Sequence, residues 1–556
     1  MISNKKEVQI LAALMLEKGI TDVVISPGSR NAPLINTFAS LPDFHCYNVV
    51  DERSAAFYAL GIALRKQCPV AVACTSGSAM LNYAPAAAEA LYQKVPLLIL
   101  SADRPREWVD QGDGQTIRQE NALQNVVKKS ISLSGAMRDE AEAWYNTRLI
   151  NEGLNALMLP ESGPVHLNFP FSEPLYELVD SPLPQAKNIQ LLGQKKGLAE
   201  GEMQHLRQQW LGAQRKMILV GQMPPNPTLE KLLNTMARER NVVILTEKTS
   251  NISGEKILSS IDNVLFACDD ADLAPDLLIT LGAQLVSKKI KAFLRRHKPL
   301  HHWYFSPSAE QQDTFMALTE VIAADPVPIL KDMPFAPWGD TTFAERWHYL
   351  DARTQDLRKR FTQDLDFCDF TVFDELMKAV PSTCTLHLAN STPVRYAQLF
   401  TSQARCYQSN RGTSGIDGVM STAAGYALAD KGFNLLLIGD LSFFYDSNAL
   451  WNQHFPANLK IVLINNSGGG IFRFLSGPAE VPASEEHFVA KHTTSAEALV
   501  KNFGLHYDKA SNLAAFKRAF NELIECPQAA VLEVLTPSQE NAEVLRAYFK
   551  YLHDNI

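Results

Sequence analysis

The sequence predicts an α/β protein of three consecutive domains with mostly parallel sheets. Short runs of leucine and β-branched residues alternate with longer helical patterns along the whole chain, which is typical of parallel sheets wrapped by helices. The length of 556 residues suits three or four domains of roughly 150 residues each. Proline-rich stretches at 170–185 and 325–339 separate three blocks, which we expect to form domains over residues 1–180, 190–340 and 360–556.

The first block opens with an apolar run that follows Lys5 and Lys6. We predict a helix here rather than a signal peptide, because Glu17 and Lys18 follow the run and Gly19 ends it. Four short apolar runs then predict strands at 22–26, 69–75, 96–102 and 164–169. Loops rich in Gly, Ser and Arg follow three of these strands, at 27–30, 76–79 and 103–107.

The second and third blocks repeat this alternation. Strands are predicted in the second block at 216–222, 242–247 and 277–283. A polar helical pattern over 342–364 is predicted to link the second block to the third. Strands are predicted in the third block at 385–390, 434–440, 459–465 and 530–536. We therefore expect the first and third domains to be of nucleotide-binding type.

The composition excludes several classes of protein. A formal charge of −8 argues against nucleic-acid binding. No apolar run approaches the length that spans a bilayer, so membrane insertion is not expected. The eight cysteines are scattered without a C-x-x-C pair, which fits reduced thiols in a cytoplasmic enzyme and neither a disulfide framework nor a zinc site.

Asp440 stands where the predicted strand 434–440 ends. The simplest interpretation is that its carboxylate caps the following helix. The alternative is that it holds a metal ion at the carboxyl end of a parallel sheet, where open α/β folds bind ligands. Asn466 lies 26 residues further on (466 − 440), where another apolar strand opens into a glycine-rich loop. A carboxylate, an amide and backbone carbonyls are hard oxygen ligands suited to Mg²⁺ or Ca²⁺.

Each half of this pattern alone is more simply explained by turn chemistry. Together, however, they resemble the diphosphate motif of thiamin-diphosphate (ThDP) enzymes, in which GDG is followed by NN; Leu441 replaces the second glycine. This resemblance implies a ThDP-binding fold of pyrimidine-binding, central and diphosphate-binding domains. It also implies Mg²⁺, with Mn²⁺ as a substitute, held by Asp440, Asn466 and the Gly468 carbonyl. The cofactor-binding residues that it implies are Ser76, Gly77, Ile416, Gly439, Asp440, Leu441, Ser442, Asn466, Gly468, Gly469, Ile471 and Phe472.

A ThDP enzyme also needs a carboxylic side chain against the aminopyrimidine ring of the cofactor. In the family this residue lies at a strand end before a helix, and Glu52 is in the matching position, followed by a helical pattern. The alternative is that Asp51 and Glu52 are first-turn acids that complement a helix dipole. The resemblance favours Glu52 as the catalytic residue that activates the cofactor.

Seven segments narrow the resemblance to one branch of the ThDP enzymes. They are residues 26–34, 51–57, 75–79, 101–107, 408–418, 439–446 and 465–472. Together they resemble the 2-succinyl-5-enolpyruvyl-6-hydroxy-3-cyclohexene-1-carboxylate (SEPHCHC) synthases of menaquinone biosynthesis, in which GDL replaces GDG. The resemblance implies a transferase that decarboxylates 2-oxoglutarate and adds the resulting succinyl carbanion to isochorismate, giving SEPHCHC and CO₂.

Both implied substrates are anionic, so the site should be rich in cations. The resemblance assigns Ser391 and Arg395 to the distal carboxylate of the intermediate derived from 2-oxoglutarate, with Arg411 nearby. The residues that it assigns to isochorismate are Ser29, Arg30, Arg104 and Gln115. Lys288 and Lys289 match a basic pair that reaches the active site, although Lys289 stands where the family commonly has Arg. The other basic residues of this segment are expected on a solvated helix face: Lys291, Arg295, Arg296 and Lys298.

Four apolar residues complete the implied site. Ile416 matches the residue that wedges ThDP into its bent shape, and Ile471, Phe472 and Leu475 match apolar contacts to cofactor and substrate; the alternative for all four is core packing. The thirteen histidines form no metal-ligand pair or nucleophilic triad, which agrees with chemistry supplied by a cofactor.

Because Glu52 and the diphosphate motif lie in different domains, the resemblance implies a homodimer or homotetramer with active sites between subunits. The competing functions are another ThDP-dependent carboligase or decarboxylase, such as acetolactate synthase, and a non-catalytic α/β binding protein.

Overall fold

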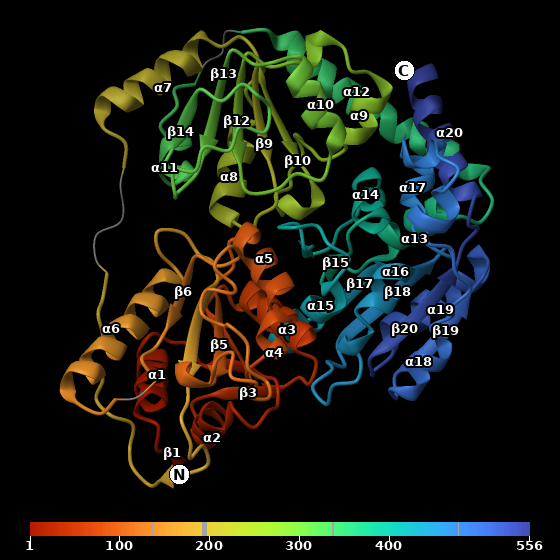
Figure 1. Cartoon of the computed structure of the whole chain (residues 1–556). Coiled ribbons are helices and arrows are strands. Elements are labelled where there is room, and N and C mark those ends of the chain that lie inside the picture. The colour runs from red at the N-terminus through yellow and green to blue at the C-terminus, as the bar shows by residue number, and fades with distance from the viewer. Residues whose placement is uncertain (136, 192–196, 336–338, 476) are drawn as a thin grey trace.

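The computed structural model describes residues 1–135, 137–191, 197–335, 339–475 and 477–556 (Figure 1). Within these ranges it has three six-stranded sheets, one in each predicted block, and all strand pairs in the three sheets are parallel. The predicted α/β class is confirmed. The domain boundaries stay predictions, and part of the proline-spaced segment 325–339 lies outside the described residues.

The first sheet has the strand order β3-β2-β4-β5-β7-β6. Its strands are β2 (Asp22–Ile25), β3 (His45–Asn48), β4 (Val70–Cys74), β5 (Leu97–Asp103), β6 (Lys129–Ser132) and β7 (Val165–Pro170). The helices of this domain that the site or the packing uses are α1 (Lys6–Glu17), α2 (Ala32–Ser40), α3 (Glu52–Lys66), α5 (Ala84–Gln93) and α6 (Glu140–Ala156). A short antiparallel pair, β1 (Ile2–Ser3) with β8 (Leu178–Val179), ties the start of the domain to its end.

The central sheet has the order β11-β10-β9-β12-β13-β14, so the strand order reverses at β9. Its strands are β9 (Lys216–Val220), β10 (Val242–Thr246), β11 (Ile257–Leu258), β12 (Leu277–Leu281), β13 (His301–Phe305) and β14 (Glu320–Ile322). Its helices are α7 (Glu200–Gly212), α8 (Pro227–Met236), α9 (Ile261–Ala267), α10 (Lys288–Arg296) and α11 (Pro326–Lys331). This is the doubly wound arrangement with helices on both faces.

The third sheet has the order β16-β15-β17-β18-β20-β19. Its strands are β15 (Thr385–Leu388), β16 (Cys406–Gln408), β17 (Asn434–Gly439), β18 (Leu459–Asn465), β19 (His506–Ala510) and β20 (Ala530–Leu535). Counted from each domain's own first strand, the first and third sheets share one order, 2-1-3-4-6-5. In such sheets the order reverses between the first and third strands, and ligands bind at the carboxyl ends there. In the third sheet this position lies between β15 and β17.

The helices of the third domain cover both faces of its sheet. They are α13 (Asp369–Ala379), α14 (Thr392–Leu399), α15 (Val419–Ala429), α16 (Asp440–Tyr445), α17 (Ile471–Phe474), α18 (Glu497–Asn502), α19 (Leu513–Glu525) and α20 (Glu540–Asp554). The helix predicted over 342–364 is present as α12 (Thr341–Gln363). Trp347 of α12 is buried in the central domain, and Leu357 is buried in the third, so this connection is packed at both ends.

The first and third domains pack directly against each other through α3 and α15. A β-carbon added at Gly61 would lie 2.1 Å from the Thr422 carbonyl oxygen, and one added at Gly425 would lie 2.0 Å from that of Tyr58. Only glycine allows the two backbones to approach this closely. One buried apolar core therefore runs through both domains.

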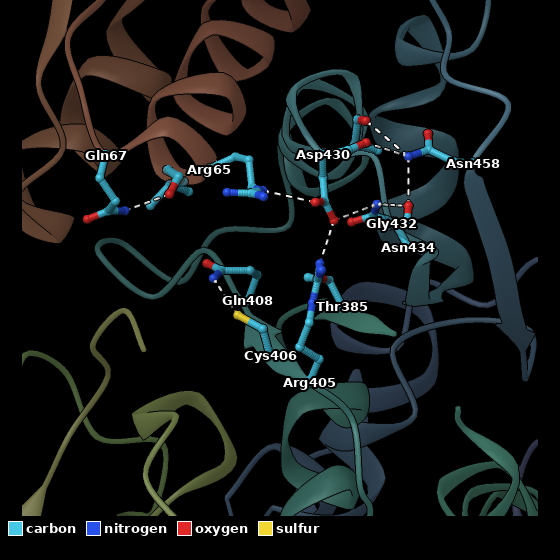
Figure 2. Close-up of polar contacts among 12 residues, drawn as sticks. Arg65, Gln67, Thr385, Arg405, Cys406, Gln408, Asp430, Gly432, Asn434 and Asn458 are labelled. Carbon is cyan, nitrogen blue, oxygen red and sulfur yellow. Dashed lines mark hydrogen bonds and ion pairs between the residues drawn. The ribbon is translucent and has the colours of Figure 1, made fainter. Parts of the chain in front are cut away.

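An ion-pair cluster at the end of α3 strengthens the same contact (Figure 2). Asp430, whose side chain is almost fully buried, accepts from Arg65 Nε at 3.0 Å and from Arg405 Nη2 at 2.6 Å. Arg65 belongs to the first domain and Arg405 to the third, so one buried carboxylate joins them. Because both partners hold it, this carboxylate is compensated inside the interface.

No helix in the described part of the chain combines the length and the apolar character needed to cross a bilayer.

Candidate functional site

A cavity of about 490 Å³ lies at the carboxyl ends of β15, β17 and β18, where the order of the third sheet reverses. Lys288 reaches this cavity from the central domain. Every third-domain residue nominated from the sequence lines it: Ser391, Arg395, Arg411, Ile416, Gly439, Asp440, Leu441, Ser442, Asn466, Gly468, Gly469, Ile471, Phe472 and Leu475. Residues separated by more than 80 positions are therefore gathered around one space.

Asp440 is the first residue of α16 and is 2% exposed. Its Oδ1 accepts from the Leu441 backbone N–H at 2.7 Å, and its Oδ2 accepts from that of Gly468 at 2.8 Å. Burial raises the pKa of this carboxyl, and the two backbone N–H groups lower it. Asp440 thus contacts both the helix start and the glycine-rich loop that follows β18. The N-cap of α16 is Gly439 and the Asp440 side chain makes no cap hydrogen bond, so the helix-cap interpretation is not supported.

The glycine-rich loop needs glycine at Gly468. Its φ is +136°, and a β-carbon there would lie 2.6 Å from the Val489 carbonyl oxygen. The Gly469 N–H donates to that same carbonyl at 2.7 Å. The loop is therefore held from outside by residue 489 while its other side faces the cavity.

Ile416 is 37% exposed although it is apolar, and it lines the cavity. The Ser442 hydroxyl donates to its carbonyl oxygen at 2.7 Å, which ties the loop of Ile416 to α16. An exposed aliphatic side chain at the cavity edge does not fit the alternative of simple core packing.

Two arginines supply positive charge to the cavity. Arg411 is 8% exposed; its Nη1 donates to Asn390 Oδ1 at 2.8 Å, and its buried Nε has no hydrogen-bond partner among the described residues. Arg395 Nη1 donates to the Ser391 carbonyl at 2.8 Å. Burial lowers the pKa of both guanidinium groups. The charge of Glu247 partly offsets this for Arg411, and the charge of Asp262 partly offsets it for Arg395. Two neighbouring cations, one buried and one half-buried, have donors left for an anionic ligand.

The loop that carries Arg411 is held by a residue that the sequence analysis missed. Glu89 of α5, in the first domain, is 1% exposed and accepts from the backbone N–H groups of Gly412 and Thr413, both at 2.7 Å. Asn390 was missed as well; its Nδ2 donates to the carbonyls of Asn410 and Gly415 at 2.6 and 2.7 Å. Asn390 ends a buried strand, which is a usable signal, but nothing local marks Glu89.

The basic segment of α10 departs from expectation in two places. Lys289 does not line the cavity; its Nζ lies 4.3 Å from the centre of the Phe266 ring. Lys291 was predicted on a solvated face, but it is half-buried and donates to the Leu285 carbonyl at 2.9 Å. The prediction for Lys291 was wrong, because this residue lies on the side of α10 that is turned toward the central domain and not toward solvent. Arg295, Arg296 and Lys298 are exposed as predicted.

The nominated residues of the first domain form a second group at the carboxyl edge of the first sheet. Ser76 Oγ donates to the Gln115 carbonyl at 2.8 Å, and Gly77 lies directly against Gln115. Arg104 Nη2 donates to the Gly114 carbonyl at 3.1 Å, in the same loop as Gln115. Ser76, Gly77, Arg104 and Gln115 are thus together.

Ser29 and Arg30 follow the neighbouring strand β2. Ser29 is exposed, whereas Arg30 is buried and donates to the Phe171 carbonyl at 3.1 Å. Arg30 Nη2 also lies 3.1 Å from Glu173, whose side chain is 66% exposed. An incoming anion would therefore compete with a solvated carboxylate for this guanidinium.

Glu52 is the first residue of α3, and Asp51 before it is the helix cap, accepting from the Ser54 N–H at 2.9 Å. Asp51 therefore caps the helix, and the carboxylate of Glu52 remains available for a different role. Glu52 is half-buried, and burial raises the pKa of its carboxyl. A carboxyl at a sheet edge with a raised pKa suits hydrogen bonding to a nitrogen base.

The two groups do not share a cavity within one chain. Among the described residues, the cavity of the third domain is lined by Lys288 and by residues between 373 and 475, with none from the first domain. Glu52, Ser76 and Arg104 therefore lie outside it.

The chemistry of the cavity fits a metal-bound diphosphate. Asp440, Asn466 and the Gly468 carbonyl offer three oxygen ligands, and Mg²⁺ ordinarily completes its shell with phosphate oxygens and water. The described residues contain no cluster of three or more His, Cys, Asp and Glu that could enclose an ion fully. An open ligand set beside Arg395 and Arg411 would suit a metal ion that is also bound by an anionic group.

Family models match three successive stretches of the chain. They are the thiamine pyrophosphate enzyme N-terminal TPP binding domain over residues 6–129, the middle domain of thiamine pyrophosphate over 185–388, and the thiamine pyrophosphate enzyme C-terminal TPP binding domain over 391–534. Together they cover most of the sequence.

Curated relatives match over nearly the full length. A 2-succinyl-5-enolpyruvyl-6-hydroxy-3-cyclohexene-1-carboxylate synthase of Flavobacterium johnsoniae is 42% identical over 559 residues, covering 98% of this chain and 98% of the relative. Proteins of the same name from Porphyromonas gingivalis and Desulfotalea psychrophila are 40% and 41% identical. They cover 99% and 95% of this chain, and 98% of each relative.

Proposed function

Because the chain belongs to the SEPHCHC synthase family of thiamin-diphosphate-dependent enzymes, we propose that it decarboxylates 2-oxoglutarate and adds the succinyl group to isochorismate. Membership makes it a transferase of menaquinone biosynthesis that uses ThDP. The observation that carries the substrate assignment is the pair of guanidinium groups, the half-buried Arg395 and the buried Arg411, beside the candidate metal ligands in one cavity.

The cofactor, when bound, would supply the carbon nucleophile of the reaction. Mg²⁺ would be held by Asp440, Asn466 and the Gly468 carbonyl. Gly439, Leu441, Ser442 and Gly469 would contact the diphosphate, and Ile416, Ile471 and Phe472 would pack against the rings. These assignments are supported by the common cavity.

The chain's own side chains then divide the remaining work. Glu52 would hydrogen-bond the aminopyrimidine ring of the bound cofactor and hold a proton there, and Ser76 and Gly77 would lie beside the ring. Ser391, Arg395 and Arg411 bind the distal carboxylate of 2-oxoglutarate, and Leu475 closes the apolar side. The groups assigned to isochorismate are Ser29, Arg30, Arg104 and Gln115. Lys288 would add positive charge at the Asp440 cavity, which it lines. We assign no substrate contact to Lys289, because its ammonium group lies 4.3 Å from the centre of the Phe266 ring.

The active site is assembled from two chains, as a homodimer or homotetramer. This is supported by the separation of the Glu52 group from the Asp440 cavity within one chain. Cytoplasmic location is supported by the eight cysteines, all of which are free thiols.

The test is an assay of the purified protein with ThDP and Mg²⁺. We expect consumption of 2-oxoglutarate and release of CO₂ that depend on isochorismate, with formation of a coupled product. Turnover that is the same with and without isochorismate would contradict the assignment and favour a simple decarboxylase. Pyruvate used in preference to 2-oxoglutarate would favour an acetolactate-type carboligase.

Arg395→Ala tests the assignment of the distal carboxylate. We expect kcat/KM for 2-oxoglutarate to fall about 10- to 100-fold, because a charge-assisted hydrogen bond contributes about 1.5–3 kcal/mol. Arg395→Lys should recover only part of the loss, since it lacks the planar fork. ThDP binding, measured by calorimetry in both variants, serves as the control and should be unchanged. An unaltered kcat/KM in Arg395→Ala would place the carboxylate elsewhere.

A further inference from the structure

We propose that Asp369 is a positioning residue that fixes the amide of Asn466 so that its oxygen faces the metal site. This inference rests on the proposed function, in which Asn466 is a metal ligand. Asp369 begins α13, 97 positions before Asn466 in the chain, and both side chains are buried, at 1% and 6% exposure.

The hydrogen bond between the backbone of Asp369 and the side chain of Asn541 can have only one direction. The backbone N–H of Asp369 lies 2.8 Å from Asn541 Oδ1, on α20. A backbone N–H can only donate, so Asn541 must present its oxygen to Asp369. Its Nδ2 then faces the hydroxyl of Thr536, at 3.4 Å.

This arrangement also fixes the direction of the hydrogen bond between Thr536 and Asp369. Because the Thr536 oxygen accepts from Asn541, its own proton is free to donate, and Asp369 Oδ1 lies 2.6 Å away. An ionised carboxylate is an acceptor at both oxygens. The partner of Asp369 Oδ2 must therefore be a donor.

That partner is Asn466, whose Nδ2 lies 3.0 Å from Asp369 Oδ2. The opposite orientation of the amide would set two acceptor oxygens against each other in a buried place, which costs free energy. With Nδ2 committed to Asp369, the amide oxygen is left for the cavity that Asn466 lines. An oxygen there can bind Mg²⁺, whereas an NH₂ group would repel the ion.

The same chain of contacts also makes Asp369 part of the sheet edge. Thr536 follows β20, and its backbone N–H donates to the Asn465 carbonyl at 3.2 Å. The loop after β18 is thus tied to α13, α20 and the end of β20. This network fixes both the position of Asn466 and the orientation of its side-chain amide. Residues that hydrogen-bond a metal ligand tune metal binding in this way.

The experiment compares the Mg²⁺ concentration for half-maximal ThDP binding among variants of the full-length apo enzyme, by calorimetry. In Asp369→Asn, the Thr536 hydroxyl holds the new oxygen, so the new NH₂ faces Asn466 and turns its amide around. We expect the half-saturating Mg²⁺ concentration to rise about 10- to 100-fold. The reciprocal double variant, Asp369→Asn with Asn466→Asp, restores a donor-acceptor pair and an oxygen at the site. It should return to within about threefold of wild type.

Asp374→Asn is the matched control, because it breaks another buried contact of α13, the ion pair with Arg358 at 3.1 Å. It should lower the thermal stability of the apo enzyme and leave the Mg²⁺ requirement unchanged. An unchanged requirement in Asp369→Asn, or a double variant no better than the single one, would overturn the inference. If Asn466→Ala itself leaves the requirement unchanged, the metal site of the proposed function fails, and the inference fails with it.

Discussion

Asp440→Ala is expected to abolish Mg²⁺-dependent ThDP binding while the chain stays folded. The carboxylate is the only charged group among the three candidate ligands Asp440, Asn466 and the Gly468 carbonyl, so its loss should weaken cofactor binding by more than about 100-fold. The apo enzyme should lose little stability, because the variant also removes a buried carboxylate whose pKa is raised by desolvation. Calorimetric titration of ThDP and thermal unfolding of the apo enzyme measure the two quantities.

Asp139→Ala is the control that separates capping from metal binding. Asp139 caps α6 by accepting from the Glu142 N–H at 2.9 Å, and it is exposed. Losing this cap should cost about 1 kcal/mol of stability with no effect on ThDP binding. If Asp440→Ala behaves like Asp139→Ala, Asp440 has only a structural role at the start of α16.

Glu52→Gln is expected to lower kcat by about 10²- to 10⁴-fold, the range over which a positioned acid or base acts. The amide keeps the shape of the side chain but cannot hold the proton on the cofactor ring. ThDP binding should change by less than about tenfold, because the diphosphate is held by the other domain. Initial rates with saturating 2-oxoglutarate and isochorismate give kcat.

Asp51→Asn is the matched control for Glu52→Gln, because it changes the neighbouring carboxylate in the same way. Asp51 caps α3 and accepts from Asn448 Nδ2 at 2.6 Å, so its loss should affect stability more than rate. Full activity in Glu52→Gln would remove Glu52 from the mechanism.

Local sequence was enough to predict the elements that end at the site. The runs before Asp440 and Asn466 are fully buried strands, and a buried strand followed by glycine and a polar residue is visible in the sequence. By contrast, β3 and β19 were not predicted, because their residues are mostly exposed or half-buried and form no apolar run. The order of strands in each sheet also depends on long-range packing, which periodicity does not encode.

The site was predictable only where its residues follow strands. Asp369 and Thr536 contact each other across 167 positions, and Glu89 reaches the Arg411 loop across more than 300. Such contacts leave no local spacing to detect. The positions of Lys289 and Lys291 were mispredicted for a different reason. Basic residues close together on one helix lie in different surroundings, against an aromatic ring, a backbone carbonyl or solvent.

The central claim is that the Glu52 group of one chain completes the Asp440 cavity of another. Glu52→Gln and Asp440→Ala chains, co-expressed with different affinity tags and purified through both, give mixed assemblies for a rate measurement. In a mixed dimer, one site has both residues intact and the other has neither, so we expect about half of the wild-type activity. If each site is built within a single chain, every site in the mixture carries one defect. Activity no higher than that of the two single variants would then contradict the claim.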